Sequence, residues 1–162
     1  VVESWNEWDT LREVWVGTLE NKNLQAATEA PVARKMKSYS RYKWPLREGL
    51  DDKACLEVAK QQLENYIDVI KGEGIVVQRP KPFPNNEELK TPLWSVERMS
   101  GFTCPRDVFF VAGKQIIEAP MSARNRYFEN LGWRDLLMSY YNADPRMRWT
   151  CAPKPKMVDS SY

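Results

Sequence analysis

An amphipathic helix that runs directly into a short apolar strand is the feature that most constrains this fold. The apolar residues that recur at helical spacing are Leu56, Leu63, Ile67 and Ile70. Asp51 and Asp52 offer N-cap chemistry before them, and a Gly-Glu-Gly stop at 72–74 ends the pattern. An apolar strand follows over 74–80, and another is predicted over 12–17. Strand, helix and strand in this order indicate an α/β layer.

The second half of the chain repeats this order without repeating the residues. A hairpin is predicted over 107–119, with its turn at 112–115, and Pro120 ends it. A helix over 122–142 and a short strand over 148–151 complete the second half. The helix is marked by Tyr127, Leu131, Leu137 and Tyr141, and Gly132 blurs its pattern. We therefore expect one domain over 1–162 with an internal boundary at about 80–104.

Two segments are predicted to be long loops. Residues 21–49 have no clean period and include a basic, aromatic stretch over 34–44. Interleaved charge and aromatic rings can bind nucleic acid, but the chain has 24 basic and 22 acidic residues, a net charge of +2. A charge so near balance favours a plain loop. The second loop, rich in proline and asparagine, runs from Pro80 to about Gly101.

Composition excludes several kinds of chemistry. The 162 residues include no histidine, so this chain alone cannot house Ser-His, Cys-His or His-metal chemistry. Three widely spaced cysteines, Cys55, Cys104 and Cys151, favour reduced thiols over a disulfide framework or a zinc site. We expect no metal and no cofactor. No apolar run is long enough to span a bilayer, and no secretion leader is apparent, so a cytoplasmic location is expected.

Asp107 is the first candidate for a functional role. It follows Cys104-Pro105-Arg106 and opens an apolar strand, so the pattern predicts a carboxylate at the mouth of that strand. Such a carboxylate can pair with a planar guanidinium, whose two parallel N–H groups match its two oxygens. Taken alone, the spacing favours a simpler interpretation, in which Asp107 caps a turn or pairs with Arg106.

The other candidates are weaker on the residues alone. Glu118 with Arg124, Arg126 and Glu129 is typical of a solvated ion-pair network near a helix start. Cys151 lies in a proline-rich loop after a strand, but without histidine it lacks a base and is not expected to act as a nucleophile.

Five stretches, taken in order, resemble one family, the amidinotransferases that move an amidino group from arginine to an amine. They are 6–17 (NEWDTLREVWVG), 105–107 (PRD), 116–121 (IIEAPM), 124–129 (RNRYFE) and 149–157 (WTCAPKPKM). The resemblance spans nearly the whole chain and corresponds to the amino-terminal portion of a family member, a little under half of its length.

The resemblance implies the pentein fold, an α/β propeller of ββαβ-type modules of which this chain would hold the first two of five. It also implies that a cysteine attacks the guanidino carbon of L-arginine, that ornithine leaves, and that the amidino group passes to an acceptor amine. A histidine would serve as acid and base, and carboxylates would hold the guanidinium. Asp107 matches the aspartate that lines the arginine site. The nucleophile, the histidine and its acidic motif would lie outside this chain, in the remainder of the polypeptide or a second chain.

Two other functions stay open at this point. A deiminase or dihydrolase of the same fold would use water in place of the amine. A non-catalytic fragment or scaffold would bind without turnover, and the missing histidine favours that for the chain in isolation. The acceptor could be glycine, an aminocyclitol phosphate or an amine of specialised metabolism, and the resemblance is compatible with a homodimer. Neither nucleic acid nor membrane is expected as a partner.

Overall fold

Two strand–helix–strand units make up most of the described chain. The computed structural model describes residues 2–20, 52–81, 87–97, 99, 101–121 and 123–154. The fold is mixed α/β, as the order of elements predicts. The predicted loop over 21–49, including the basic, aromatic stretch at 34–44, lies outside the described residues.

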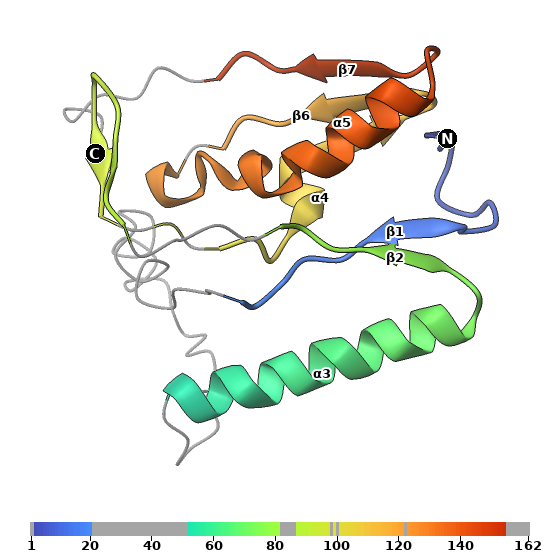
Figure 1. Cartoon of the computed structure of the whole chain (residues 1–162), viewed down its shortest axis with the longest axis horizontal. Helices are drawn as coiled ribbons and strands as arrows, with labels where there is room; N and C mark the ends of the chain where they lie inside the picture. The colour runs from blue at the N-terminus through green and yellow to red at the C-terminus, as the bar shows by residue number, and fades with distance from the viewer. Residues whose placement is uncertain are drawn as a thin grey trace.

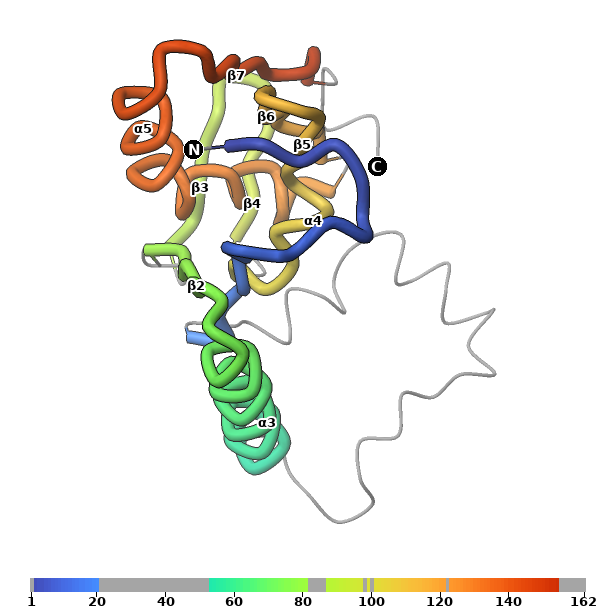
Figure 2. Tube along the Cα trace, turned by 90° about the vertical axis from the view of Figure 1, so that its right-hand side faces the viewer, coloured from blue at the N-terminus to red at the C-terminus, as the bar shows by residue number. Residues whose placement is uncertain are grey.

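The first unit consists of β1 (Glu13–Trp15), α3 (Asp52–Gly72) and β2 (Val76–Gln78). The two strands pair in parallel, with Glu13 opposite Val76. Helix α3 lies along one side of this pair, and the sheet of the second unit lies on the other side (Figures 1 and 2). Ile67 and Ile70 are buried, so the helical period predicts the buried face correctly. The predicted end at the Gly-Glu-Gly stop is also confirmed.

The second unit is a three-stranded sheet with a helix across it. Strands β5 (Phe109–Ala112), β6 (Gln115–Glu118) and β7 (Arg148–Cys151) lie in that order. The first two form the predicted antiparallel hairpin, and β6 and β7 are parallel. Gly113 makes the tight turn at φ +58°, a conformation that glycine adopts without steric cost. Helix α5 (Arg134–Ala143) connects β6 to β7.

The helix predicted over 122–142 is wrong in its first half. The chain forms two 3-10 turns, η1 (Arg124–Arg126) and η2 (Glu129–Trp133), before α5 begins. Gly132 lies against the ring of Phe102, and a Cβ at that position would come within 2.5 Å of a ring carbon. The close approach explains the glycine that blurs the helical pattern.

The proline-rich loop after Pro80 contains an unpredicted pair of short strands, β3 (Leu89–Lys90) and β4 (Ser95–Val96). They pair antiparallel, and the Thr91 hydroxyl closes their turn by donating to the Trp94 carbonyl at 2.8 Å. Two-residue strands are too short to show a period in the sequence.

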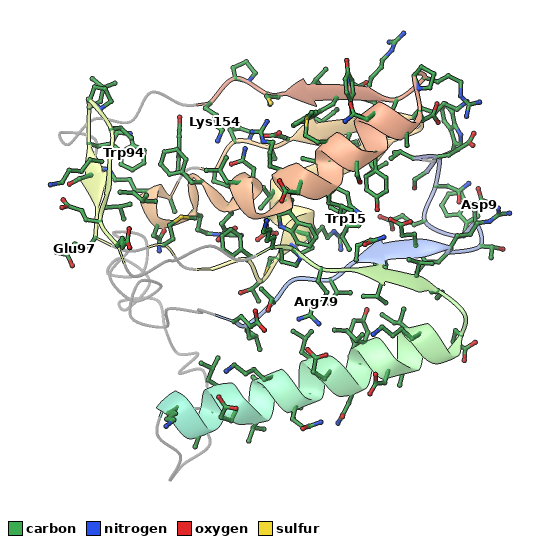
Figure 3. The ribbon with its side chains drawn as sticks, in the orientation of Figure 1. Asp9, Trp15, Arg79, Trp94, Glu97 and Lys154 are labelled. Atoms are coloured by element: carbon green, nitrogen blue, oxygen red, sulfur yellow. The ribbon has the colours of Figure 1, made fainter. Side chains whose placement is uncertain are left out.

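The main core lies between the sheet of the second unit and α5. Its fully buried members are Val108, Phe109, Ile116, Trp133, Leu137 and Met147. Trp15 of β1 packs against this core and stacks between Trp133 and Tyr140, with ring centroids 5.2 and 5.8 Å away. Figure 3 shows Trp15 between the β1–β2 pair and α5. The Tyr140 hydroxyl also donates to Glu13, so one aromatic stack joins the two units.

Within the described ranges, no helix is both long and apolar enough to cross a membrane.

Candidate functional site

Asp107 lies at the edge of the sheet where β6 and β7 end. It belongs to a one-turn helix, α4 (Pro105–Val108), so the prediction that it opens the strand itself is wrong. The strand begins two residues later at Phe109, which is buried in the core together with Val108. Antiparallel pairing sets Phe109 opposite Glu118, the last residue of β6. Asp107 therefore reaches the carboxyl edge of β6, which is where ligand sites form in α/β sheets.

The Asp107 carboxylate is half exposed and accepts a hydrogen bond from Arg126. Nη1 of Arg126 donates to Oδ2 of Asp107 at 2.9 Å, and the Asp107 side chain is 49% exposed. Arg106, the partner suggested by the sequence, instead approaches Glu7 at 3.9 Å on the surface. The long-range partner is thus Arg126, 19 residues further along the chain.

Arg126 is in turn fixed by a buried carboxylate. Its Nε and Nη2 donate to Oε1 and Oε2 of Glu129 at 2.9 and 2.8 Å, a bidentate pair. The Glu129 side chain is 3% exposed and that of Arg126 is 26% exposed. The hydrogen bonds that Arg126 donates to Glu129, and secondarily to Asp107, raise the pKa of Arg126 above its ordinary value. The guanidinium is therefore permanently charged.

A second buried carboxylate, Glu118, lies at the end of β6. It accepts the indole N–H of Trp149 at 2.8 Å and the side-chain amide of Asn130 at 2.5 Å, and Arg134 approaches at 3.7 Å. Buried carboxylates need such partners because desolvation penalises their charge. Glu118 and Glu129 are both buried, so the interpretation of this segment as a solvated ion-pair network is wrong for these two residues.

Cys151 and Lys154 lie beyond the same edge of the sheet. Cys151 ends β7 opposite Glu118 and is exposed, and partial desolvation followed by the neighbouring Glu118 charge raises the pKa of its thiol. Lys154, labelled in Figure 3, donates to the Tyr127 carbonyl at 3.0 Å and lies 4.5 Å from the Tyr127 ring centroid. Burial lowers the pKa of Lys154.

Sequence reasoning missed the partners that connect these residues. It named Asp107, Arg126, Glu129 and Glu118 but not their pairing. The three-residue spacing of Arg126 and Glu129 was the available signal, since residues three apart share a helical face. The contacts of Asp107 with Arg126 and of Glu118 with Trp149 left no local signal.

The described residues hold no cluster of three or more metal-ligating side chains. The arrangement instead offers a half-exposed carboxylate with one oxygen engaged by Arg126. Such a group can bind a cation, above all a planar guanidinium.

Comparison with known proteins shows related sequences and structures. No family model matches the chain. The glycine amidinotransferase, mitochondrial, of Xenopus tropicalis is 37% identical over 98% of this chain and 37% of its own length. Inosamine-phosphate amidinotransferase 1 of Streptomyces griseus is 32% identical over 97% of this chain and 44% of its own length. The solved structure of SxtG, an amidinotransferase of the saxitoxin biosynthetic pathway from Microseira wollei, is 40% identical and superposes with a TM-score of 0.80.

The chain belongs to the amidinotransferase family. The likeness to SxtG covers 99% of this chain and 44% of SxtG, so the family resemblance holds along the whole sequence. The chain nevertheless spans less than half the length of these relatives.

Proposed function

We propose that the protein containing this chain transfers an amidino group from L-arginine to an acceptor amine, and that Asp107 binds the donor's guanidino group. The likeness to amidinotransferases along nearly the whole chain carries the proposal. The half-exposed Asp107 carboxylate at the carboxyl edge of the sheet supports the assignment of the donor site.

The proposed binding follows from complementary shape and charge. Arginine carries a planar cation whose N–H groups point in fixed directions, and a carboxylate accepts them. Arg126 engages Oδ2 of Asp107, no other side chain among the described residues engages this carboxylate, and Oδ1 is the oxygen that would receive the donor. A charge-assisted hydrogen bond of this kind contributes about 1.5 to 3 kcal/mol.

The proposed reaction has two transfer steps. A cysteine thiolate attacks the guanidino carbon, the bond from that carbon to the ornithine nitrogen breaks, and ornithine leaves with a proton from a histidine. The acceptor amine then attacks the amidino carbon and gives its proton to the histidine, and the bond from that carbon to sulfur breaks so that the thiolate departs. We place the nucleophile and the histidine outside this chain, because the 162 residues hold no histidine and the pKa of Cys151 is raised.

We also propose that the two strand–helix–strand units are the first two modules of a pentein propeller. Parallel strand pairs bridged by α3 and α5 support this arrangement. The remaining modules would come from the rest of the polypeptide or from a second chain, and a homodimer is compatible with the proposal.

The acceptor is proposed only as a primary amine. The relatives are named for glycine and for an inosamine phosphate, and SxtG for the saxitoxin pathway. Because these names point to chemically different acceptors, amines of each kind have to be tested.

A second candidate is a binding or scaffold function without turnover, which the absence of histidine favours for the chain alone. Incubation of the purified protein with L-arginine labelled at the guanidino carbon separates the outcomes. Transfer predicts a cysteine adduct with the mass of one amidino group, free ornithine, and label in a new guanidino product once an amine is added.

Labelled citrulline, or ammonia released with no amine product, would instead show a hydrolase of the deiminase or dihydrolase type. An unmodified protein that binds arginine without releasing ornithine would leave only the scaffold function. Asp107→Asn is the matched variant, and it should weaken arginine binding without unfolding the chain.

A further inference from the structure

Three charged side chains form a line from the interior to the surface at the edge of the sheet. Glu129 is 3% exposed, Arg126 is 26% exposed and Asp107 is 49% exposed. Each is joined to the next by hydrogen bonds of 2.8 to 2.9 Å. The buried end is therefore anchored and the exposed end is the one that a ligand can reach.

We propose that Arg126 and Glu129 are positioning residues that fix the Asp107 carboxylate for a guanidino ligand. Arg126 holds Oδ2 in place and leaves Oδ1 as the acceptor, while Glu129 holds Arg126. The inference rests on the proposed function, because it takes Asp107 as the residue that binds the donor.

The geometry of Arg126 suits this role better than any other cation would. Its guanidinium uses Nε and Nη2 on Glu129 and Nη1 on Asp107, so one rigid plane is attached at three donors to two carboxylates. A lysine ammonium is a point charge on a flexible stem and cannot reproduce this fork. Replacement by lysine would keep the charge and release the Asp107 carboxylate.

The charges also suit a cationic ligand. A lone arginine beside Asp107 would neutralise the carboxylate that has to attract a guanidinium. Glu129 offsets the positive charge that Arg126 brings, so two of the three charged side chains in the line are acidic. The line can thereby order Asp107 without removing its attraction for a cation.

The chain contains a matched pair that lacks this arrangement. Arg146 donates through Nε and Nη2 to both oxygens of Asp144 at 3.0 and 3.1 Å. It resembles the Arg126 pair in being bidentate on a buried carboxylate, but Arg146 is 60% exposed and lies just before β7. Arg146→Lys is therefore the control for loss of a bidentate pair as such.

The test measures binding of methylguanidinium and methylammonium to the 162-residue chain by titration calorimetry. Arg126→Lys should weaken methylguanidinium binding about tenfold, or about 1.4 kcal/mol, and leave methylammonium binding within about twofold. Arg146→Lys should change neither affinity by more than about twofold. Loss of selectivity between the two cations is the signature of positioning, since damage to the fold would weaken both.

Unchanged methylguanidinium binding in Arg126→Lys, with Asp107→Asn still weakened, would overturn the positioning role and leave Asp107 as the binding residue. Equal binding by wild type and Asp107→Asn would overturn the proposed site itself and the positioning role with it. Near-ultraviolet circular dichroism checks that each variant is folded. If Arg126→Lys does not fold, Glu129→Asp takes its place. This variant retracts the anchoring carboxylate by one methylene and should likewise weaken binding of methylguanidinium but not of methylammonium.

Discussion

The two strand–helix–strand units place their polar side chains differently. In the first unit, the described part of α3 buries Ile67 and Ile70 and keeps its charges exposed, as in the pair of Glu64 with Arg79. In the second unit, Glu118 and Glu129 are buried. Two 3-10 turns replace a regular crossover there, and their residues meet the edge of the sheet. The site therefore lies where two 3-10 turns, rather than a continuous helix, follow β6 in the second unit.

The largest expected effect tests where the core lies. Leu137 of α5 is fully buried, whereas Val69 of α3 is 67% exposed. Leu137→Ala should lower the free energy of unfolding by about 2 to 5 kcal/mol, because it removes buried methyl groups and leaves a cavity. Val69→Ala should change it by less than about 0.5 kcal/mol. Urea unfolding measures both, and equal losses would contradict the contrast between the units.

A smaller effect tests the buried acid of the second unit. Glu118→Gln puts an amide N–H₂ where the carboxylate accepts from Trp149 and Asn130, so one buried donor loses its acceptor. We expect a loss of about 1 to 3 kcal/mol in the free energy of unfolding. The control in the first unit is Glu64→Gln at an exposed ion pair, which should cost less than about 0.5 kcal/mol. If Glu118→Gln left the free energy of unfolding unchanged, the claim that the buried acid contributes more to stability than the exposed one would be contradicted.

The smallest effect concerns the thiol at the end of β7. Burial and Glu118 raise the pKa of Cys151, so a smaller fraction is thiolate at any pH below that pKa. Alkylation by iodoacetamide at pH 8 should therefore be slower than that of N-acetylcysteine, and the rates should converge as pH rises. Peptide mapping gives the rate at Cys151. A faster rate than that of N-acetylcysteine would contradict the raised pKa of Cys151.

The regular elements could be predicted from the sequence because their signals are local. Helix α3 shows the 3.6-residue period over 21 residues, and the hairpin is marked by β-branched residues around Gly113. The start of α5 was missed because the 3-10 turns bury the polar Glu129 and Asn130 beside Trp133, and the helical period of apolar residues does not detect them.

The site could be predicted only one residue at a time. Asp107 was named from its motif, but its location at the carboxyl edge depends on the register of Phe109 with Glu118. The pair of Asp107 with Arg126 spans 19 residues and that of Glu118 with Trp149 spans 31. Such contacts depend on tertiary packing, which composition and spacing do not encode.

The most direct measurement compares binding of L-arginine and L-citrulline to the wild-type chain and to Asp107→Asn. Citrulline has the same backbone and a neutral ureido group, so the comparison isolates the guanidinium, and the four affinities form a thermodynamic cycle. The account predicts that wild type prefers arginine by about tenfold or more and that the preference falls toward one in Asp107→Asn. An undiminished preference for arginine in Asp107→Asn would contradict the claim that this carboxylate receives the donor.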